Sequence, residues 1–490
     1  MTDKAIKVIK ASLWITVGSW AIRLLSILSV IVLARNLDKY DFGVIAACFI
    51  VQGLFNAISG LGSGKYLIRK SKITDSDINN AWTINFFTRN LMAGLIFVSS
   101  DTAAVLLEVA EISFALKVMS LSLVFQSLIS PAINLHVKSL NYSKLTLLEI
   151  LAKLISTSSS IFITIKYQNY FGVIIGEVIH SGIYAIGTQF IVRHRLRFEV
   201  NNFNDQWSFT KWILAKGIVS YVKTAADKIM IGKNFSTQDL GLYNFSLDTA
   251  RLPSSIFIEP IKRVLYPSLS EYIPKPEELI SKLNKYIYSI NCIYIPIVFG
   301  GTYLAQDIIS VVFGDKWLES ASLFVMFLPM TYLGILVSIY TEVFTLTGRV
   351  RLQFYFESIT SLVFVLICLF SLDLDLLDFV LIRAMFPYMV LILMMLTLRR
   401  FIPLSILNLH LLMIIPAICS SCMILFIDLV GLNIIVSNNF VSLLFNIVIG
   451  AVIYGVLLLI STMRCATSHV ESKFVLDTFI RPLLRANLRR

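Results

Sequence analysis

The sequence predicts an all-α polytopic membrane protein with about fourteen transmembrane helices. Of its 490 residues, 57% are hydrophobic and only 15% are charged, whereas a soluble domain carries about 25% charged residues. The mean hydropathy is +0.79. Apolar runs of roughly 20 residues, the length that crosses a bilayer as a helix, recur along the chain. Together these three observations favour a helical protein that uses the bilayer as its solvent.

The apolar runs set the predicted limits of the spans. The first run is too long for the core of a cleavable signal peptide, so we expect it to remain as the first span. The third, fourth, seventh and eighth runs are weaker signals because they carry charges. The predicted limits are 12–33, 42–63, 80–100, 112–133, 145–166, 170–192, 211–231, 243–265, 284–305, 321–346, 353–372, 376–398, 406–428 and 440–462.

Lysine and arginine in the connections predict the orientation, because positively charged loops stay in the cytoplasm. With a cytoplasmic N-terminus, 28 of these residues lie on the cytoplasmic side and 6 on the opposite side. We therefore predict that both termini are cytoplasmic. The same asymmetry accounts for the formal net charge of +12. Since no soluble basic module interrupts the spans, we expect no nucleic-acid partner.

A short repeat follows the first span and occurs again after the seventh. Residues 33–43 read LARNLDKYDFG and residues 231–241 read IGKNFSTQDLG, with Asn, Asp and Gly at the same offsets. Copies six spans apart have the same orientation, which predicts two halves related by a pseudo-two-fold axis along the membrane normal. The predicted divisions are an N-lobe at 1–200 (helices 1–6), a C-lobe at 201–402 (helices 7–12), helices 13 and 14 at 403–465, and a basic cytoplasmic tail at 466–490.

Several short motifs carry a family resemblance over the first two-thirds of the chain. They are VLARNLDKYDFG at 32–43, GLGSGKYLIRK at 60–70, DKIMIGKNFSTQDLGLYNFSLDTARLP at 227–253, VLYPSLSEY at 264–272 and VVFGDKW at 311–317. In their order and spacing the chain resembles Wzx-type flippases, the polysaccharide transporters of the multidrug/oligosaccharidyl-lipid/polysaccharide (MOP) superfamily. Within that family it is most similar to the branch typified by the colanic acid exporter.

The resemblance implies both an architecture and a cargo. It implies two six-helix lobes around a central cavity that works by alternating access. The implied cargo is undecaprenyl-pyrophosphate-linked oligosaccharide (an O-antigen, capsule or exopolysaccharide repeat unit), moved from the cytoplasmic to the periplasmic leaflet of the bacterial inner membrane. The bilayer is then the immediate surroundings, and polysaccharide polymerase and chain-length machinery are candidate partners. The resemblance further implies that cavity cations lie on the first and eighth spans.

Two neighbouring spans each carry a polar stripe on an otherwise apolar helix. The seventh span places Lys216, Ser220, Lys223 and Asp227 at i, i+4, i+7 and i+11, and the eighth places Asp248, Arg251, Ser255 and Glu259 at i, i+3, i+7 and i+11. A charge at the bilayer centre costs at least about 2.5–3.5 kcal/mol. We therefore expect both stripes to face the protein interior or a water-filled cavity.

Two interpretations of the membrane charges remain open. In one, they are ion pairs that lock helices together, with Lys216 beside Glu259. Asp227 would then pair with Arg251 or Lys223. In the other, the cations bind an anionic cargo, and Arg23 is the first choice because a planar guanidinium makes two parallel hydrogen bonds to phosphate. The candidate cargo-binding residues are Arg23, Arg251, Lys153, Lys223 and Lys216, and the candidate ion-pair or coupling residues are Asp227, Asp248, Glu259, Glu177 and His180.

Glu177 and His180 share a face of the sixth span at i and i+3. This spacing fits a proton relay, and it fits equally well a pair of satisfied interior polar groups.

The sequence contains no catalytic triad, zinc signature or nucleotide-binding fingerprint, so we expect no enzyme activity, no metal and no cofactor. GLGSGK at 60–65 is not a P-loop, because Tyr66 stands where Ser or Thr is required. Three classes of function were weighed. A flippase fits best, a small-molecule or multidrug exporter of the same superfamily is the alternative, and a membrane enzyme such as a polymerase is disfavoured by the short outer connections.

Single cysteines in a cysteine-free background test the predicted topology. An impermeant thiol reagent added to intact cells should label Asp41→Cys, Asp315→Cys and Asp375→Cys, which we place in the periplasm. It should label Arg69→Cys, Lys275→Cys and Arg400→Cys only after the inner membrane is opened. Labelling of Lys275→Cys in intact cells would overturn the arrangement in two halves.

Overall fold

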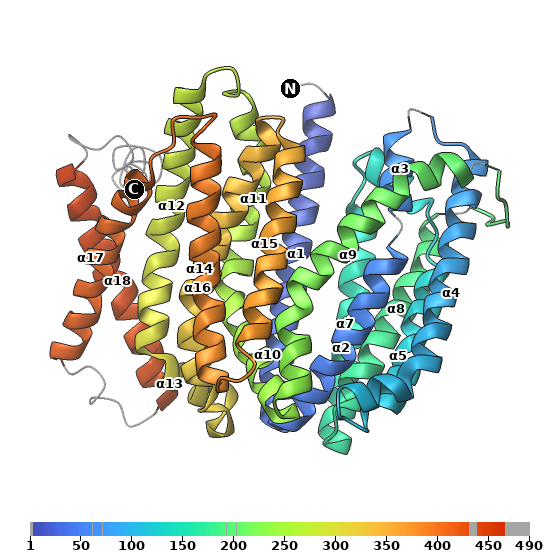
Figure 1. The fold of residues 1–490 in the computed structure, drawn as a ribbon, viewed down its shortest axis with the longest axis horizontal. Helices are drawn as coiled ribbons and strands as arrows, with labels where there is room; N and C mark the ends of the chain where they lie inside the picture. Colours follow the sequence, from blue (N-terminus) through green and yellow to red (C-terminus); the bar gives the residue numbers. More distant parts are fainter. Residues whose placement is uncertain are drawn as a thin grey trace, which may run out of the picture. The chain divides into compact units, whose positions relative to one another are not determined.

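The regular structure of the described chain is helical. The computed structural model describes residues 3–60, 62–70, 72–192, 194–201, 203–430 and 439–465, and the predicted tail at 466–490 lies outside them. These ranges contain no strand, which confirms the all-α fold class (Figure 1). The helices are α1 (Asp3–Asn36), α2 (Lys39–Ser59), α3 (Ser63–Arg69), α4 (Asp75–Leu106), α5 (Ile112–Ser127), α6 (Ile133–Lys138), α7 (Ser143–Tyr167), α8 (Phe171–Ile191), α9 (Phe203–Asn234), α10 (Thr237–Pro253), α11 (Glu259–Ser270), α12 (Pro276–Tyr303), α13 (Ala305–Ile308), α14 (Ser320–Leu346), α15 (Val350–Phe370), α16 (Leu376–Leu398), α17 (Ile406–Val430) and α18 (Asn439–Cys465), with shorter helical turns at Ser254–Ile258, Ile309–Phe313 and Asp315–Trp317.

Every predicted span overlaps helical structure. Among the described helices, 9 are long and apolar enough to cross a membrane, or 10 if Pro276–Tyr303 and Ala305–Phe313, bent by 83°, form one span. Helices α4, α5, α9 and α10 are not among them, and these are the four spans expected to be weak. Fourteen crossings therefore stay a prediction, while the helical pattern itself is confirmed.

The eighth predicted span is not one regular helix. Helix α10 ends at Pro253, a π-helical turn covers Ser254–Ile258, and α11 begins at Glu259. Proline lacks the N–H that a regular helix needs and its ring clashes with the carbonyl four residues earlier. A π-turn also changes the angle between successive side chains. The straight-helix register that we expected to align Asp248 and Arg251 with Glu259 is therefore interrupted.

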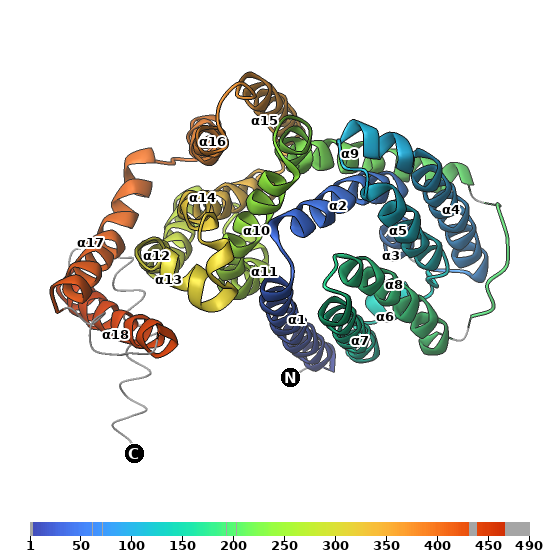
Figure 2. The ribbon, with the colours of Figure 1, turned by 90° about the horizontal axis from the view of Figure 1, so that it is seen from below.

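The described chain forms two compact units. Unit 1 comprises Met1–Asn244 with Ser361–Leu372, and unit 2 comprises Phe245–Thr360 with Asp373–Arg490. In unit 1, α7 packs along α1 and α8, α5 along α4 and α8, and α2 along α5 and α9; Figure 2 shows α7, α8 and α5 side by side. In unit 2, α14 packs on α12 and α16, and α17 on α12 and α18. The lobe boundary predicted at 200 falls inside unit 1, because α9 packs on α2.

Small residues bring α7 and α8 together. A methyl group added to Gly172 would lie 2.2 Å from the hydroxyl oxygen of Thr164, and one added to Gly176 would lie 2.9 Å from Cβ of Ser160. Ser160 and Thr164 are buried. Small residues of this kind let membrane helices approach closely and pack by dispersion. The contact between α7 and α8 therefore rests on backbone proximity.

Polar residues explain why α4 is a weak span. Asn79 accepts a hydrogen bond from the backbone N–H of Arg197 at 3.2 Å and donates one to the Glu199 carboxylate at 3.2 Å. The hydroxyl of Thr83 accepts from the backbone N–H of Glu199 at 2.9 Å. These side chains hold the segment between α8 and α9 against α4. These polar side chains therefore form hydrogen bonds within the protein and do not face lipid.

Both copies of the sequence repeat start a helix in the same way. Before α2, Asp38 and Asp41 exchange side-chain and backbone hydrogen bonds of 2.8 and 3.2 Å. Before α10, Ser236 and Asp239 do the same at 3.1 and 3.1 Å. This arrangement is a capping box, which satisfies N–H groups that the first turn of a helix leaves without partners. The shared Asp of the repeat is thus the third helical residue in both copies.

A glycine from each copy brings the two repeats into contact. A methyl group on Gly43 would lie 1.9 Å from the carbonyl oxygen of Thr237, and one on Gly241 would lie 1.9 Å from the carbonyl oxygen of Lys39. Thr237 and Lys39 are equivalent positions of the repeat, so the contact is reciprocal. Only a residue without Cβ allows this approach. The repeat is therefore confirmed as a structural unit within unit 1.

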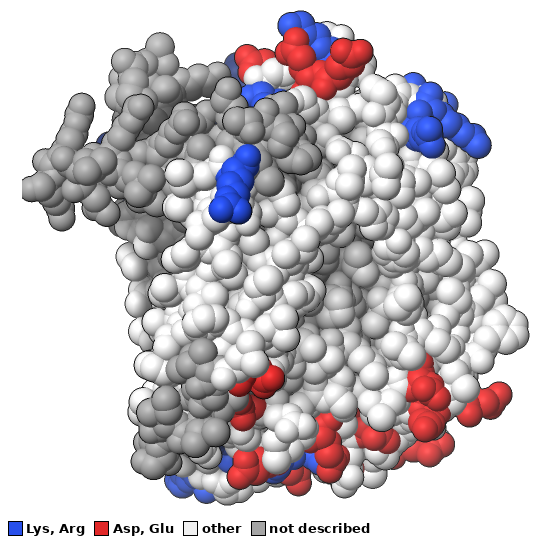
Figure 3. Space-filling view, turned by 90° about the vertical axis from the view of Figure 1, so that its left-hand side faces the viewer, with Lys and Arg blue, Asp and Glu red and all other residues white. Residues whose placement is uncertain are grey.

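Large apolar side chains cover the outside of the helices. Leu429 is 85% exposed, Phe370 is 84% exposed and Phe190 is 80% exposed. On the face turned to the viewer in Figure 3, a broad band carries almost no charge, and charged residues gather toward its two ends. An apolar surface of this extent marks contact with a membrane. The chain is therefore a multi-pass membrane protein.

The glycine contact predicts which substitutions destabilise the protein. Gly43→Ala or Gly241→Ala should lower stability by about 1–3 kcal/mol, the usual cost of overpacking, because each methyl group would overlap a backbone oxygen. The melting temperature of the detergent-purified protein measures the effect. Gly94→Ala is the matched control, since a methyl group there meets nothing within 4 Å. Equal melting temperatures for all three variants would contradict the tight contact.

Candidate functional site

A polar cavity lies among the helices of unit 1 at the level of the predicted spans. Its volume is about 280 Å³. Helix α1 contributes three residues, Ser29 among them, α2 contributes one, and α7 and α8 contribute the other polar side chains. The lining residues are Ile22, Ser29, Leu33, Phe49, Glu149, Lys153, Ser156, Thr157, Ser160, Val173, Gly176, Glu177 and His180.

Four titratable side chains meet in this cavity. Glu149 and Lys153 lie one turn apart on α7, and Glu177 and His180 lie one turn apart on α8, so each pair shares a helical face. Nε2 of His180 lies 3.6 Å from Oε1 of Glu149, and their side chains are 25% and 39% exposed. The ring of Tyr184 stacks on that of His180, with centroids 6.3 Å apart. The structure thus brings Lys153, predicted as a cargo-binding residue, together with Glu177 and His180, predicted as a pair on the sixth span.

Hydroxyl groups form the rest of the polar lining. Ser156 donates to the carbonyl oxygen of Lys153 at 3.0 Å, and Thr157 and Ser160 are buried beside it. Sequence reasoning missed Glu149 as a member of the site and overlooked these hydroxyls. The run STSSS at 156–160 inside an apolar span was a usable signal, because hydroxyls in succession on a membrane helix must include some that face inward.

Arg23 occupies the middle of the first span. The span covers Lys10–Asn36, and Arg23 is half-buried with its Nη1 atom shielded from solvent. Its neighbour Ile22 lines the cavity in unit 1. The serines one turn away, Ser19 and Ser26, donate to the carbonyl oxygens of Ile15 and Ile22 at 2.7 and 2.9 Å. Their hydroxyls are thus engaged by their own helix.

The charges of α9 lie partly in a buried polar network. Asp227 is 1% exposed and accepts a hydrogen bond of 2.6 Å from the hydroxyl of Tyr243, which is completely buried. Lys228 donates to the side-chain oxygen of Asn244. Lys223 is half-buried, and the side chain of Lys216 lies outside the described part of the chain. The described partners of Asp227 thus include a tyrosine, and its pairing with Arg251 or Lys223 stays a prediction.

In unit 2 the predicted charges form short pairs within one helix. Arg251 lies 3.7 Å from Asp248 on α10, with side chains 47% and 54% exposed. Glu259 lies 3.2 Å from Lys262 at the start of α11. Exposed pairs at i and i+3 contribute little stability. The pair of Lys216 with Glu259 stays a prediction.

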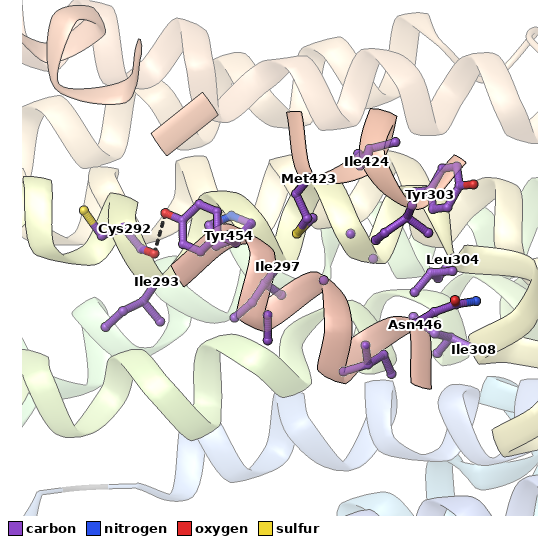
Figure 4. A pocket seen from close by; sticks show the side chains of 17 residues that line it. Cys292, Ile293, Ile297, Tyr303, Leu304, Ile308, Met423, Ile424, Asn446 and Tyr454 are labelled. Atoms are coloured by element: carbon purple, nitrogen blue, oxygen red, sulfur yellow. Dashed lines mark hydrogen bonds between the residues drawn. The ribbon is translucent and has the colours of Figure 1, made fainter. Parts of the chain in front are cut away.

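An apolar groove lies between α12, α17 and α18 of unit 2 (Figure 4). Its volume is about 400 Å³, and its lining includes Ile297, Met423, Ile424 and Ile447. Tyr454 closes one part of it by donating a hydrogen bond of 2.8 Å to the carbonyl oxygen of Cys292. A groove with this lining suits a hydrocarbon chain. It does not suit a charged headgroup.

The described residues include no group of three His, Cys, Asp or Glu side chains that could hold a metal ion.

A family model described as polysaccharide biosynthesis protein matches residues 32–322. The chain is 23% identical over 318 residues to an uncharacterized membrane protein in the cps region of Klebsiella pneumoniae. It is 21% identical over 315 residues to the lipopolysaccharide biosynthesis protein WzxC of Escherichia coli strain K12. Each match covers 64% of this chain, and the chain spans just under two thirds of the length of these relatives, 66% and 64%.

Among solved structures, the chain is similar to the lipid II flippase MurJ in an inward closed conformation. The TM-score is 0.76 with 15% sequence identity, over 92% of this chain and 98% of that one. At this identity the likeness concerns the fold.

The Asp227 network predicts a stability effect. Tyr243→Phe should destabilise the protein by about 1–3 kcal/mol, because it removes a donor from a buried carboxylate. Asp227→Asn added to Tyr243→Phe should recover part of the loss, since it removes the buried charge. Melting temperatures in detergent measure both effects. Tyr355→Phe is the control, since Tyr355 is 63% exposed, and a loss in that control as large as in Tyr243→Phe would refute the network.

Proposed function

This chain belongs to the polysaccharide biosynthesis protein family as a Wzx-type member of the MOP superfamily, and on that premise we propose that it is a flippase for undecaprenyl-pyrophosphate-linked oligosaccharide. It moves the cargo from the cytoplasmic to the periplasmic leaflet of the bacterial inner membrane by alternating access, with no covalent step. Both termini lie in the cytoplasm. Polysaccharide polymerase and chain-length machinery then receive the cargo on the far side.

The observation that carries this proposal is the arginine at the centre of the first span. The pyrophosphate of the cargo must cross hydrocarbon, where an uncompensated charge is very costly. Arg23 supplies a fixed positive charge at that depth, with Nη1 shielded from water, and a guanidinium pairs with phosphate through two hydrogen bonds. A neutral cargo would need no such charge at this depth.

The other candidate cations differ in how well they suit the pyrophosphate. Lys223 is half-buried on α9, and Arg251 lies beside Asp248; we propose both as secondary contacts, with Lys216 as a further candidate. Lys153 shares its cavity with two glutamates. These glutamates offset its charge, so we assign it a minor part in cargo binding.

The apolar groove of unit 2 suits the other end of the same cargo. It is lined by isoleucine and methionine side chains of α12, α17 and α18 and by Leu304, which follows α12, and the polyprenyl chain of the cargo is a hydrocarbon. A flippase must hold a charged headgroup and leave the lipid chain in apolar surroundings. The groove of unit 2 meets the second of these needs.

The alternative is a small-molecule or multidrug exporter. Such a protein would confer resistance to cationic dyes and would depend on acidic cavity residues. Dye accumulation in cells with and without the gene distinguishes the two, since a flippase leaves dye accumulation unchanged.

Arg23→Ala should reduce surface polysaccharide in a complemented deletion strain by about 10- to 100-fold, because a hydrogen-bonded charge pair contributes about 1.5–3 kcal/mol. Arg23→Lys should restore export only in part, since an ammonium lacks the planar fork. Protein level and membrane insertion should not change. Arg351→Ala, at an exposed position of α15, is the control. Normal export by a well-expressed Arg23→Ala, Arg251→Ala variant would refute the assignment.

A further inference from the structure

A side chain of α18 binds a carbonyl group that a proline frees in α12. Pro296 lies inside α12, and because proline has no N–H it leaves the carbonyl oxygen of Cys292, four residues earlier, without its helical donor. The hydroxyl of Tyr454 donates to that oxygen at 2.8 Å in a buried hydrogen bond. Figure 4 shows this bond at one end of the apolar groove, with Tyr303 and Leu304 toward the other end. The proline of α12 therefore creates the acceptor that α18 binds.

A second proline and a side chain of α12 repeat this arrangement in α17. Pro416 lies inside α17 and frees the carbonyl oxygen of Leu412 in the same way. Asn291 is completely buried, and its Nδ2 donates to that oxygen at 3.1 Å. A carbonyl oxygen only accepts, so the NH2 end of the amide points to α17. The Oδ1 end accepts from the hydroxyl of Tyr332 on α14 at 2.8 Å. Both freed carbonyls are thus satisfied by a neighbouring helix.

We propose that Asn291 and Tyr454 are positioning residues that lock α17 and α18 to α12. The three helices then move as one body, and the groove between them keeps its shape through the transport cycle. Asn291 and Cys292 are adjacent in the sequence, so the two bonds hold α12 at the same level. The inference rests on the proposed function of the groove, which is to hold the lipid chain of the cargo.

The bilayer makes these two hydrogen bonds strong constraints. In hydrocarbon no water replaces a lost partner, so a carbonyl without a donor is costly there. Separation of α18 from α12 would leave the oxygen of Cys292 without the donor from Tyr454. Separation of α17 from α12 would do the same to the oxygen of Leu412. Each of the two helices is therefore held to α12 by a group that a membrane does not satisfy.

Apolar packing joins α17 to α18 beside the two hydrogen bonds. Cys419, Met423 and Ile427 of α17 form one buried cluster with Tyr454 of α18. A methyl group added to Gly450 of α18 would lie 3.2 Å from Cδ1 of Ile427, so the helices approach closely. Met423, Ile427, Gly450 and Tyr454 also line the groove. The walls of the groove are therefore part of the same packed block as the two locks.

A hinge is the other role that prolines take in membrane helices, and it fits Pro296 and Pro416 less well. A hinge absorbs a large change in backbone dihedral angles, which requires the backbone groups around it to change partners. The carbonyls of Cys292 and Leu412 are instead held by buried side chains of neighbouring helices. These two prolines therefore act as docking points between helices.

Replacement of the proline tests the lock, because alanine at position 296 restores the N–H that the carbonyl of Cys292 lacks. Tyr454→Phe should lower the melting temperature of the full-length protein in lipid nanodiscs by about 2–4 °C. In the Pro296→Ala background the same substitution should cost much less. Tyr294→Phe is the matched control, since Tyr294 is a buried tyrosine of α12 whose hydroxyl bonds to that of Thr331 at 3.0 Å. Pro296→Ala should leave the cost of the control unchanged.

Asn291→Leu with Pro416→Ala is a second and independent pair. Asn291→Leu should lower the melting temperature, because the carbonyl of Leu412 loses its donor and the hydroxyl of Tyr332 loses its acceptor. Pro416→Ala should recover part of the loss, since it supplies an N–H to that carbonyl and nothing to the tyrosine. Where one pair does not fold, the other decides.

Cargoes with two lipid chain lengths distinguish positioning of the groove from a general loss of stability. The probes are undecaprenyl- and farnesyl-pyrophosphate carrying the same oligosaccharide, and the farnesyl chain offers the groove much less apolar surface to bury. In proteoliposomes, Tyr454→Phe should raise the half-saturating concentration of the undecaprenyl cargo by about 5- to 30-fold. The maximal rate should not change, and neither should transport of the farnesyl cargo. Pro296→Ala should reduce the shift in half-saturating concentration.

The outcomes separate the lock from the transport function. If the unmodified protein moves neither cargo, the flippase proposal fails, and the melting temperatures still test the lock. If Pro296→Ala does not reduce the cost of Tyr454→Phe, or reduces that of Tyr294→Phe equally, the lock at Cys292 is refuted. If Tyr454→Phe impairs both cargoes to the same extent, its role is structural only and the positioning of the groove is refuted.

Discussion

The cost of placing charge in hydrocarbon is the constraint that organises this protein. It forces the chain to hide each membrane-depth charge in a cavity, in a hydrogen bond to a buried tyrosine or in a pair along one helix. The Glu149–His180 contact, Asp227 and the Arg251–Asp248 pair are examples of these three solutions. A charge left without such compensation is expensive at membrane depth. The proposed anionic cargo gives the arginine of the first span a reason to remain there.

Close packing of helix backbones is the second constraint, because helices that already touch through their backbones leave room beside the contact for polar side chains. Gly43 and Gly241 join the two repeats, and Gly172 and Gly176 join α7 to α8. Where helices meet through glycine, side chains need not fill the interface. Polar groups on the neighbouring faces, such as Ser156 and Lys153, can then line a cavity.

The fold class followed from the sequence because the length of an apolar run is a local property. Every predicted span overlaps helical structure, although a π-turn divides the eighth, and the capping boxes that start α2 and α10 were not foreseen from the repeat. The π-turn after Pro253 could not be predicted, since a proline is compatible with a kinked helix, a helix end or a local widening of the helix. The contact between Glu149 and His180 also could not be predicted from the sequence. Residue spacing shows which side chains share a face of α7 or of α8, but it does not show which faces of the two helices pack together. The proposed cargo-binding role of Arg23 depends on chemistry that residue spacing does not show.

The most direct measurement of the central claim is the leaflet distribution of a labelled lipid-linked oligosaccharide in vesicles that contain only this purified protein. A membrane-impermeant lectin or glycosidase reports the fraction on the outer leaflet over time. In vesicles with the protein, we expect the accessible fraction to rise from the share initially in the outer leaflet toward all of the labelled lipid, while in protein-free vesicles it stays at the initial value. Identical time courses in the two preparations, with folded protein verified in the membrane, would contradict it.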